Sequence, residues 1–196
     1  MFVSLEHPTW CDSIGRAYVN DDFVKYSDQP TTYRSDRSTV RKAYARMQRR
    51  NLNLFGSIDV PVRFVKNDPY DNYADMKASV EKEGVLFIFS GGSTPKNLSH
   101  TDNCIARAVH DWYGHLGFDV DFTLKGEFMK WYRMIDYYHP SITQLLFAEV
   151  VAQVAAVHCS GGFEYDQRDI LAPSRWIESV CEYYDKPVPE GTYYHE

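Results

Sequence analysis

Two histidines stand five positions apart in the segment His110–His115, which reads HDWYGH. On an ideal α-helix this spacing separates the two rings by about 140° around the axis. Both rings can contact one metal ion if the helix ends or bends between them, and Gly114 is the expected place for that change. Asp111 is expected to bind the ion directly or to orient an imidazole ring by a hydrogen bond. The segment therefore predicts a metal site.

A third ligand is predicted on a later apolar helix. In the stretch Leu145–Val157, eleven of thirteen residues are apolar, all the way around the helix, so this helix is expected to be buried. The two exceptions, Glu149 and Gln153, are four positions apart and share one face. A buried carboxylate is costly unless it is paired, protonated or bound to a metal. Glu149 is thus predicted to be a metal ligand or an acid/base, and the alternative is a structural acid bonded to an arginine or a tyrosine.

Two imidazoles and one carboxylate form the ligand set of mononuclear non-haem Fe(II) sites, which leave positions open for oxygen and substrate. The predicted metal ligands are His110, His115 and Glu149. Fe(II) is the first expectation for the metal. The same three side chains could hold Zn(II) with a bound water, which would support hydrolysis instead.

The segment His110–His115, together with Glu149, resembles the metal site of the pterin-dependent aromatic amino acid hydroxylases. Those enzymes carry a His-(acidic)-x-x-Gly-His motif and a glutamate on a later apolar helix. The spacing inside the motif matches, while the gap of 34 residues from His115 to Glu149 is shorter than in that family. The resemblance implies an iron centre and an oxygen-activating hydroxylase. No pterin-binding residue can be assigned in this chain.

A second resemblance spans about residues 55–160 and is similar to an uncharacterised bacteriophage domain that occurs alone and inside large polyvalent phage proteins. The matching positions are Asp68-Pro69-Tyr70, Val85–Phe89, Val109–His115, Phe122, Gly126-Glu127 and Glu149 with Gln153. This resemblance implies a phage-encoded protein in the host cytoplasm, with association with the virion as an alternative. It adds Glu127 and Gln153 to the candidate site residues.

The remaining candidates have supporting roles. Asp111 and Gln153 are expected to orient ligands or substrate, and Tyr113 to line the pocket. Glu127 stands near a predicted helix start, where an acid interacts favourably with the helix dipole. Its alternative roles are a fourth ligand or a general acid/base, the latter above all at a zinc site. The substrate, a small molecule or a protein side chain, is not specified by these residues.

A basic stripe precedes the predicted site. Between Arg34 and Arg50 there are seven basic residues and one acid, Asp36. Arg34, Arg37, Arg41 and Arg46 could bind the phosphates of a nucleic acid. The net charge of the chain is −6, which argues against a generally basic nucleic-acid binder, so a solvated face paired with acids elsewhere is favoured.

The chain of 196 residues predicts one domain of mixed α+β class, mainly helical, with a helical core and a small two- or three-stranded sheet. An N-terminal arm (1–34) is expected before a helix and a small β-α-β part (35–90), followed by a helical metal-site part (99–185) and a tail (186–196). Strands are expected at 60–65 and 85–89. Helices are expected at 12–18, 38–54, 71–83, 101–116, 124–138, 141–159 and 174–184.

The composition is that of a globular protein, with 44% hydrophobic and 24% charged residues. No unbroken apolar run reaches the roughly 20 residues of a membrane span, so no membrane partner is expected. The four cysteines are expected to be reduced thiols. The main alternative to an enzyme is a non-enzymatic phage protein that travels with the virion or binds a host factor. In that protein the His/Asp/Glu cluster would be a structural network.

Overall fold

The computed structural model describes residues 8–20, 36–162 and 167–195, and most of the predicted N-terminal arm, including Arg34, lies outside these ranges. Within them the chain is mainly helical with one small sheet, which confirms the predicted fold class. In chain order the elements are α1 (Thr9–Asn20), α2 (Arg37–Phe55), β1 (Val62–Val65), α3 (Tyr73–Glu83), β2 (Leu86–Phe89), α4 (His100–Val109), η1 (His110–Leu116), α5 (Leu124–Met134), η2 (Ile135–Tyr137), η3 (Pro140–Ile142), α6 (Thr143–Phe147), η4 (Ala148–Ala152), α7 (Gln153–Ser160) and α8 (Ser174–Tyr183).

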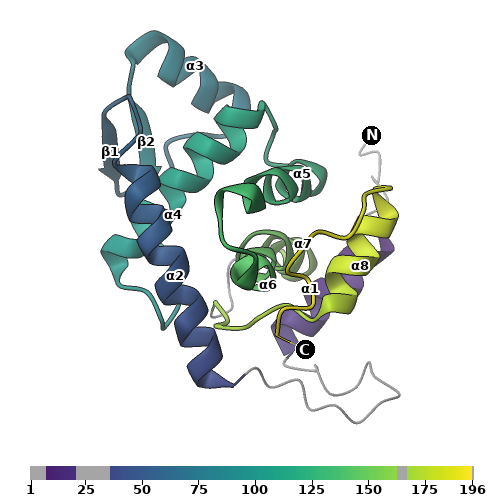
Figure 1. The fold of residues 1–196 in the computed structure, drawn as a ribbon. Coiled ribbons are helices and arrows are strands. Elements are labelled where there is room, and N and C mark those ends of the chain that lie inside the picture. The colour runs from purple at the N-terminus through teal and green to yellow at the C-terminus, as the bar shows by residue number, and fades with distance from the viewer. Residues whose placement is uncertain (1–7, 21–35, 163–166, 196) are drawn as a thin grey trace, which may run out of the picture.

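The sheet consists of β1 and β2, which pair in parallel from Val62 opposite Leu86 to Val65 opposite Phe89. Helix α3 makes the crossover between them, as the sequence predicts, and it ends at Gly84 in the left-handed conformation that glycine adopts without strain. The sheet and α3 lie together at one end of the molecule, next to the upper half of α2 (Figure 1). This end of the fold supports α4, the helix that leads into the predicted metal site.

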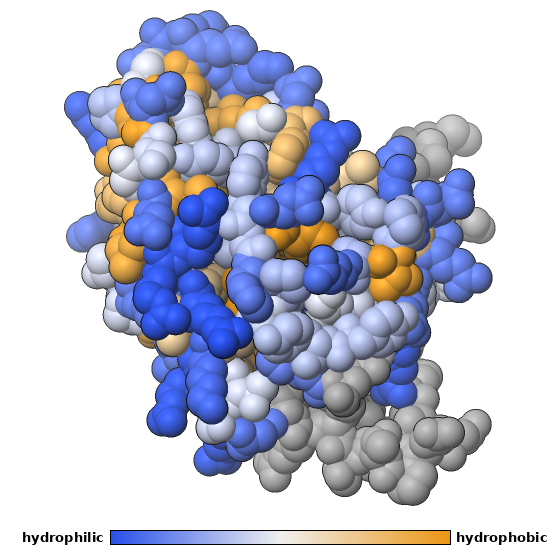
Figure 2. All heavy atoms as spheres, viewed as in Figure 1, coloured by the Kyte–Doolittle hydropathy of each residue, from blue (hydrophilic) through white to orange (hydrophobic). Residues whose placement is uncertain are grey.

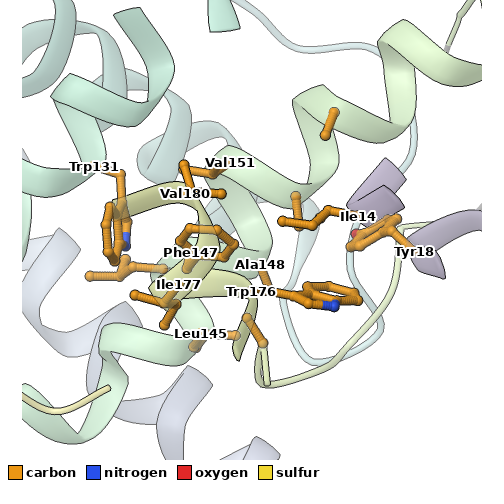
Figure 3. Close-up of a cluster of buried hydrophobic side chains, with 14 of the residues drawn as sticks. Ile14, Tyr18, Trp131, Leu145, Phe147, Ala148, Val151, Trp176, Ile177 and Val180 are labelled. Atoms are coloured by element: carbon orange, nitrogen blue, oxygen red, sulfur yellow. The ribbon is translucent and has the colours of Figure 1, made fainter. Parts of the chain in front are cut away.

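The main core surrounds the apolar segment Pro140–Ser160, which runs through η3, α6, η4 and α7. Its side chains Phe147, Ala148 and Val151 are buried and lie among side chains of α1 and α8 (Figure 3). Polar residues interrupt this segment, but it is long and apolar enough to cross a membrane by length and composition. The fold buries 61% of its most apolar window, and a core helix passes the same test.

Helix α1 packs closely on α7 through Gly15. A Cβ atom at this position would lie 2.5 Å from the Ala155 carbonyl oxygen and 2.6 Å from Cys159 Sγ, so any side chain here must push the two helices apart. We expect Gly15→Ala to lower the free energy of unfolding by about 1–3 kcal/mol, although alanine favours helices more than glycine does. Urea unfolding measures this loss.

The matched control is Gly56→Ala, at the end of α2. There the nearest atom to an added Cβ is 3.6 Å away and the backbone is in the right-handed region, so stability should change little. Equal stability of the two variants would contradict the close approach of α1 and α7.

Candidate metal centre

The two histidines of the site are brought together by a π-helical segment, η1 (His110–Leu116). In a π-helix the backbone hydrogen bonds join residues five apart, so such residues lie one above the other on the same side. His110 Nε2 and His115 Nε2 are 3.1 Å apart. The expected end or bend at Gly114 is therefore corrected, because the helix widens through this segment and continues.

Gly114 has a different purpose, since it makes room for a lysine. A Cβ atom at Gly114 would lie 2.5 Å from Lys130 Cδ, so only glycine lets the buried stem of Lys130 pass. Lys130 Nζ lies 2.5 Å from Glu127 Oε2, 2.8 Å from His110 Nδ1 and 3.5 Å from His115 Nε2. Lys130 was not among the site residues predicted from the sequence, although its i,i+3 spacing from Glu127 places both on one face of α5.

Glu127 is the carboxylate that joins the two histidines. Thr123 caps α5 by accepting a hydrogen bond from the Gly126 amide, and this start of the helix turns Glu127 inward. Glu127 Oε1 lies 3.2 Å from His115 Nε2, and Glu127 Oε2 lies 3.7 Å from His110 Nε2. Its side chain is only 7% exposed, so an interaction with the helix dipole alone does not describe it.

The spacing of these three groups suits one metal ion. Two ligand atoms at about 2.1 Å from an ion and at right angles to each other lie about 3.0 Å apart. The pairs His110–His115 and His115–Glu127 are at 3.1 and 3.2 Å, and the three ligand atoms all lie within 4.8 Å of one another. The Lys130 ammonium lies in the same space, so a divalent ion would compete with it for the nitrogen and oxygen atoms of His110, His115 and Glu127.

Hydrogen bonds and burial prepare both rings as ligands. His115 is fully buried, and its Nδ1 lies 3.0 Å from the Val120 carbonyl oxygen, which selects the tautomer that leaves Nε2 free to bind a metal. Burial, and then the charge of Lys130, hold the pKa of His110 well below its usual value, so this ring is neutral. A neutral imidazole is the form that binds metals.

Asp111 lies beside the centre, with Oδ1 3.9 Å from His110 Nε2. Burial raises the pKa of this carboxyl to about 6. Glu127 differs from Asp111. Burial alone would raise the pKa of Glu127, but the positive charge of Lys130 beside it holds this pKa below the usual range. Glu127 is therefore ionised throughout the mildly acidic range, whereas Asp111 takes up a proton as the pH falls to about 6.

The centre forms part of the wall of a cavity of about 470 Å³, within the size range of small-molecule sites. The cavity brings together most of the side chains that the sequence analysis selected, namely His110, Asp111, His115, Glu127, Glu149 and Gln153. Phe122 stands at the exposed side, with its ring edge-to-face on His115 at 4.6 Å. Asp68 and Asp71 also line the cavity and are exposed to solvent, so we place them at its rim.

Glu149 is in the cavity wall but not in the group of three ligand atoms, where the structure places Glu127 instead. Its Oε1 accepts a hydrogen bond of 2.5 Å from the Tyr44 hydroxyl of α2, which is the tyrosine partner that the alternative interpretation expected. Burial is the main reason that the pKa of Glu149 rises to about 7, and the nearby Asp169 adds to it. The choice of Glu149 as third ligand rested on its apolar helix, and a buried helix position does not specify which neighbour it faces.

Tyr113 is corrected as a pocket residue. Neighbouring positions of η1 point in different directions, and the Tyr113 side chain packs away from the cavity against Tyr137. Its hydroxyl donates a hydrogen bond of 3.0 Å to the Leu54 carbonyl oxygen. This residue fixes α2 against η1 and is not among the residues that line the cavity.

The basic stripe lies on the outer side of α2, away from the cavity. Figure 2 shows hydrophilic side chains along this helix, and Arg37, Arg41, Lys42, Arg46 and Arg49 are exposed. Arg46 contacts Ser141 Oγ, and Arg50 Nε donates to the Tyr137 carbonyl oxygen at 2.6 Å. Among the described residues, no ion pair of this stripe with an acid is recorded. A role in binding nucleic acid stays a prediction.

Comparisons of the chain with protein-family models, curated proteins and solved structures found no match. The geometry of the centre and its cavity therefore carries the functional argument.

Proposed function

We propose that this protein is a small metal-dependent enzyme of the mononuclear non-haem iron type. The observation that supports this most directly is the convergence of His110, His115 and Glu127 at the wall of the 470 Å³ cavity. Two histidines and one carboxylate are the ligand set of non-haem Fe(II) oxygenases. Bound Fe(II) would supply the activation of oxygen. The His110–His115 motif resembles that of the aromatic amino acid hydroxylases and favours hydroxylation as the reaction, although the proposed third ligand is Glu127 and not the later Glu149 of that resemblance.

The surrounding side chains have separate tasks in this proposal. The Val120 carbonyl holds the His115 ring in the orientation that points Nε2 at the centre. Asp111 lies within reach of His110 and of a substrate in the cavity, and its raised pKa suits it to hold or release a proton near neutral pH. Gln153 lies in the cavity wall, where an amide can orient a polar substrate group. In keeping with the phage-like pattern, we place the protein in the host cytoplasm.

The first experiment is elemental analysis of untagged protein purified without oxygen. We expect about one iron per chain, and a loss of at least tenfold in metal affinity in His115→Ala and in Glu127→Gln. Glu149→Gln should keep the metal, and circular dichroism checks that each variant is folded. Zinc in place of iron would redirect the proposal to hydrolysis, with a metal-bound water and Asp111 nearby.

A structural network is the competing explanation, because the Lys130 ammonium already neutralises Glu127 at 2.5 Å. A protein that contains no metal and takes up neither Fe(II) nor Zn(II) would contradict our proposal and support this network. In that case His115→Ala would lower stability with or without added metal.

A further inference from the structure

Glu149 is a charged group in the cavity that the proposed metal centre does not use. It belongs to the π-helical segment η4, and its carboxylate lies in the cavity wall. The Tyr44 hydroxyl donates a hydrogen bond to Oε1. Within the described part of the chain, Glu149 forms no ion pair. A partly buried carboxylate therefore lines the cavity without a positive partner among the described residues.

The electrostatic environment makes this arrangement costly. Besides burial, the charged group that acts on Glu149 is Asp169, a second acid, and the Tyr44 hydroxyl offers one hydrogen bond in compensation. An ionised carboxylate in such a position is destabilised until a cation joins it. A ligand that carries a positive charge to Oε2 would remove the penalty.

The remainder of the cavity suits the carbon part of such a ligand. The same cavity that Glu149 and the histidine pair line has apolar side chains in its wall, namely Trp131, Met134, Leu146, Val150 and Val154. The exposed acids Asp68 and Asp71 on the rim favour the approach of a cation. The Arg107 side chain, also in the wall, is held by the Phe89 and Gly91 carbonyl oxygens at 2.8 and 2.6 Å, which fixes its position.

We infer that Glu149 recognises the protonated amine of an alkylamine ligand whose carbon chain extends along the apolar wall toward His110 and His115. This inference deepens the proposed function. The alkylamine would be a substrate only if the proposed metal centre is present, so that part rests on the proposed function. The binding of the amine itself requires only the cavity and Glu149.

The test compares three six-carbon probes by titration calorimetry at pH 8, using n-hexylamine, 1-hexanol and hexanoate. We expect the wild-type protein to bind hexylamine at least tenfold more tightly than either other probe. Glu149→Gln should reduce this preference to less than threefold. Glu81→Gln removes an equal charge from the exposed surface of α3, outside the cavity lining, and it should retain the preference.

Each other result has a definite meaning. Equal binding of amine and alcohol, tighter binding of hexanoate, no binding of any probe, or an equal loss in Glu81→Gln would overturn the inference. Metal binding by the same proteins is measured in parallel with Zn(II). If Glu149→Gln loses zinc, Glu149 is a ligand and the inference fails. If the wild type binds hexylamine but no metal, the proposed function fails and the amine site remains.

Discussion

Lys130→Met is expected to tighten the binding of a divalent metal by at least tenfold. Lys130 Nζ lies 2.5 Å from Glu127 Oε2 and 3.5 Å from His115 Nε2, so the ammonium occupies the space between the proposed ligands. A single and a double positive charge 3.5 Å apart repel each other by about 2 kcal/mol even at the dielectric constant of water, and by more in a buried site. Methionine retains the shape of the stem without the charge, so the repulsion disappears.

The same substitution should weaken the protein when no metal is bound. Glu127 would lose its buried partner, and an unpaired buried charge costs about 3–5 kcal/mol. Added Zn(II) should recover this loss, because the metal would replace the missing charge. Unfolding in urea, with and without Zn(II), measures both effects, and competition with a chelating dye gives the affinity.

The control is Lys77→Met, which removes a surface lysine paired with Asp119 at 2.7 Å. Exposed ion pairs contribute little, so its metal affinity and stability should stay close to those of the wild type. If Lys130→Met bound metal no more tightly than the wild type, Lys130 would not compete with the ion, and the metal centre would have to lie elsewhere.

Glu149→Gln is expected to stabilise the protein at alkaline pH and to have little effect at pH 4. Burial and Asp169 raise the pKa of Glu149 from 4.5 to about 7, so the folded state holds this proton more tightly than the unfolded state does. The stability contributed by the group is fully present below pH 4.5 and is lost as the pH rises through 7. The rise in the pKa of Glu149 corresponds to a loss of about 3 kcal/mol in the free energy of unfolding at alkaline pH. Glutamine should restore this stability at pH 8, because it carries no charge.

Urea unfolding of both proteins at intervals from pH 4 to pH 8 checks this expectation. The difference between the variant and the wild type isolates Glu149, since Asp111 titrates in both. A Glu149→Gln protein that is less stable than the wild type at pH 8 would show that the carboxylate is already compensated. A gain in stability with loss of amine binding is the pattern of a residue retained for function.

The sequence was sufficient for the architecture but only partly for the site. The strands and helices follow from short apolar runs, caps and glycine stops, such as the run before Ser90 and the left-handed Gly84, which are local signals. The pairing of His110 with His115 was expected only if the helix ended or bent between them, and the π-helix that achieves it was not predicted. The identity of the third proposed ligand could not be predicted, because Glu127 and Glu149 are both acids on apolar helix faces. Only the packing of α5 against η1 selects Glu127.

Lys130 shows why such sites resist prediction from sequence. Most lysines are exposed, so a lysine in the middle of α5 is expected to face solvent. The sequence gives no sign that Lys130 points into the protein. Its place depends on Gly114, which is sixteen positions earlier and on another helix. Two residues that fit together in this way can be recognised only after the helices are packed.

The proposed metal ligands all lie within residues 110–127, whereas Tyr44 and Glu149 come from α2 and η4. The proposed reactive centre and the group that would select a ligand are thus held by separate segments of the backbone. Substitutions along α2 or near η4 can alter which molecules enter the cavity while the three converging side chains stay in place. Such a division would allow descendants of one ancestral chain to acquire new substrates through a few changes, without having to rebuild the chemistry each time.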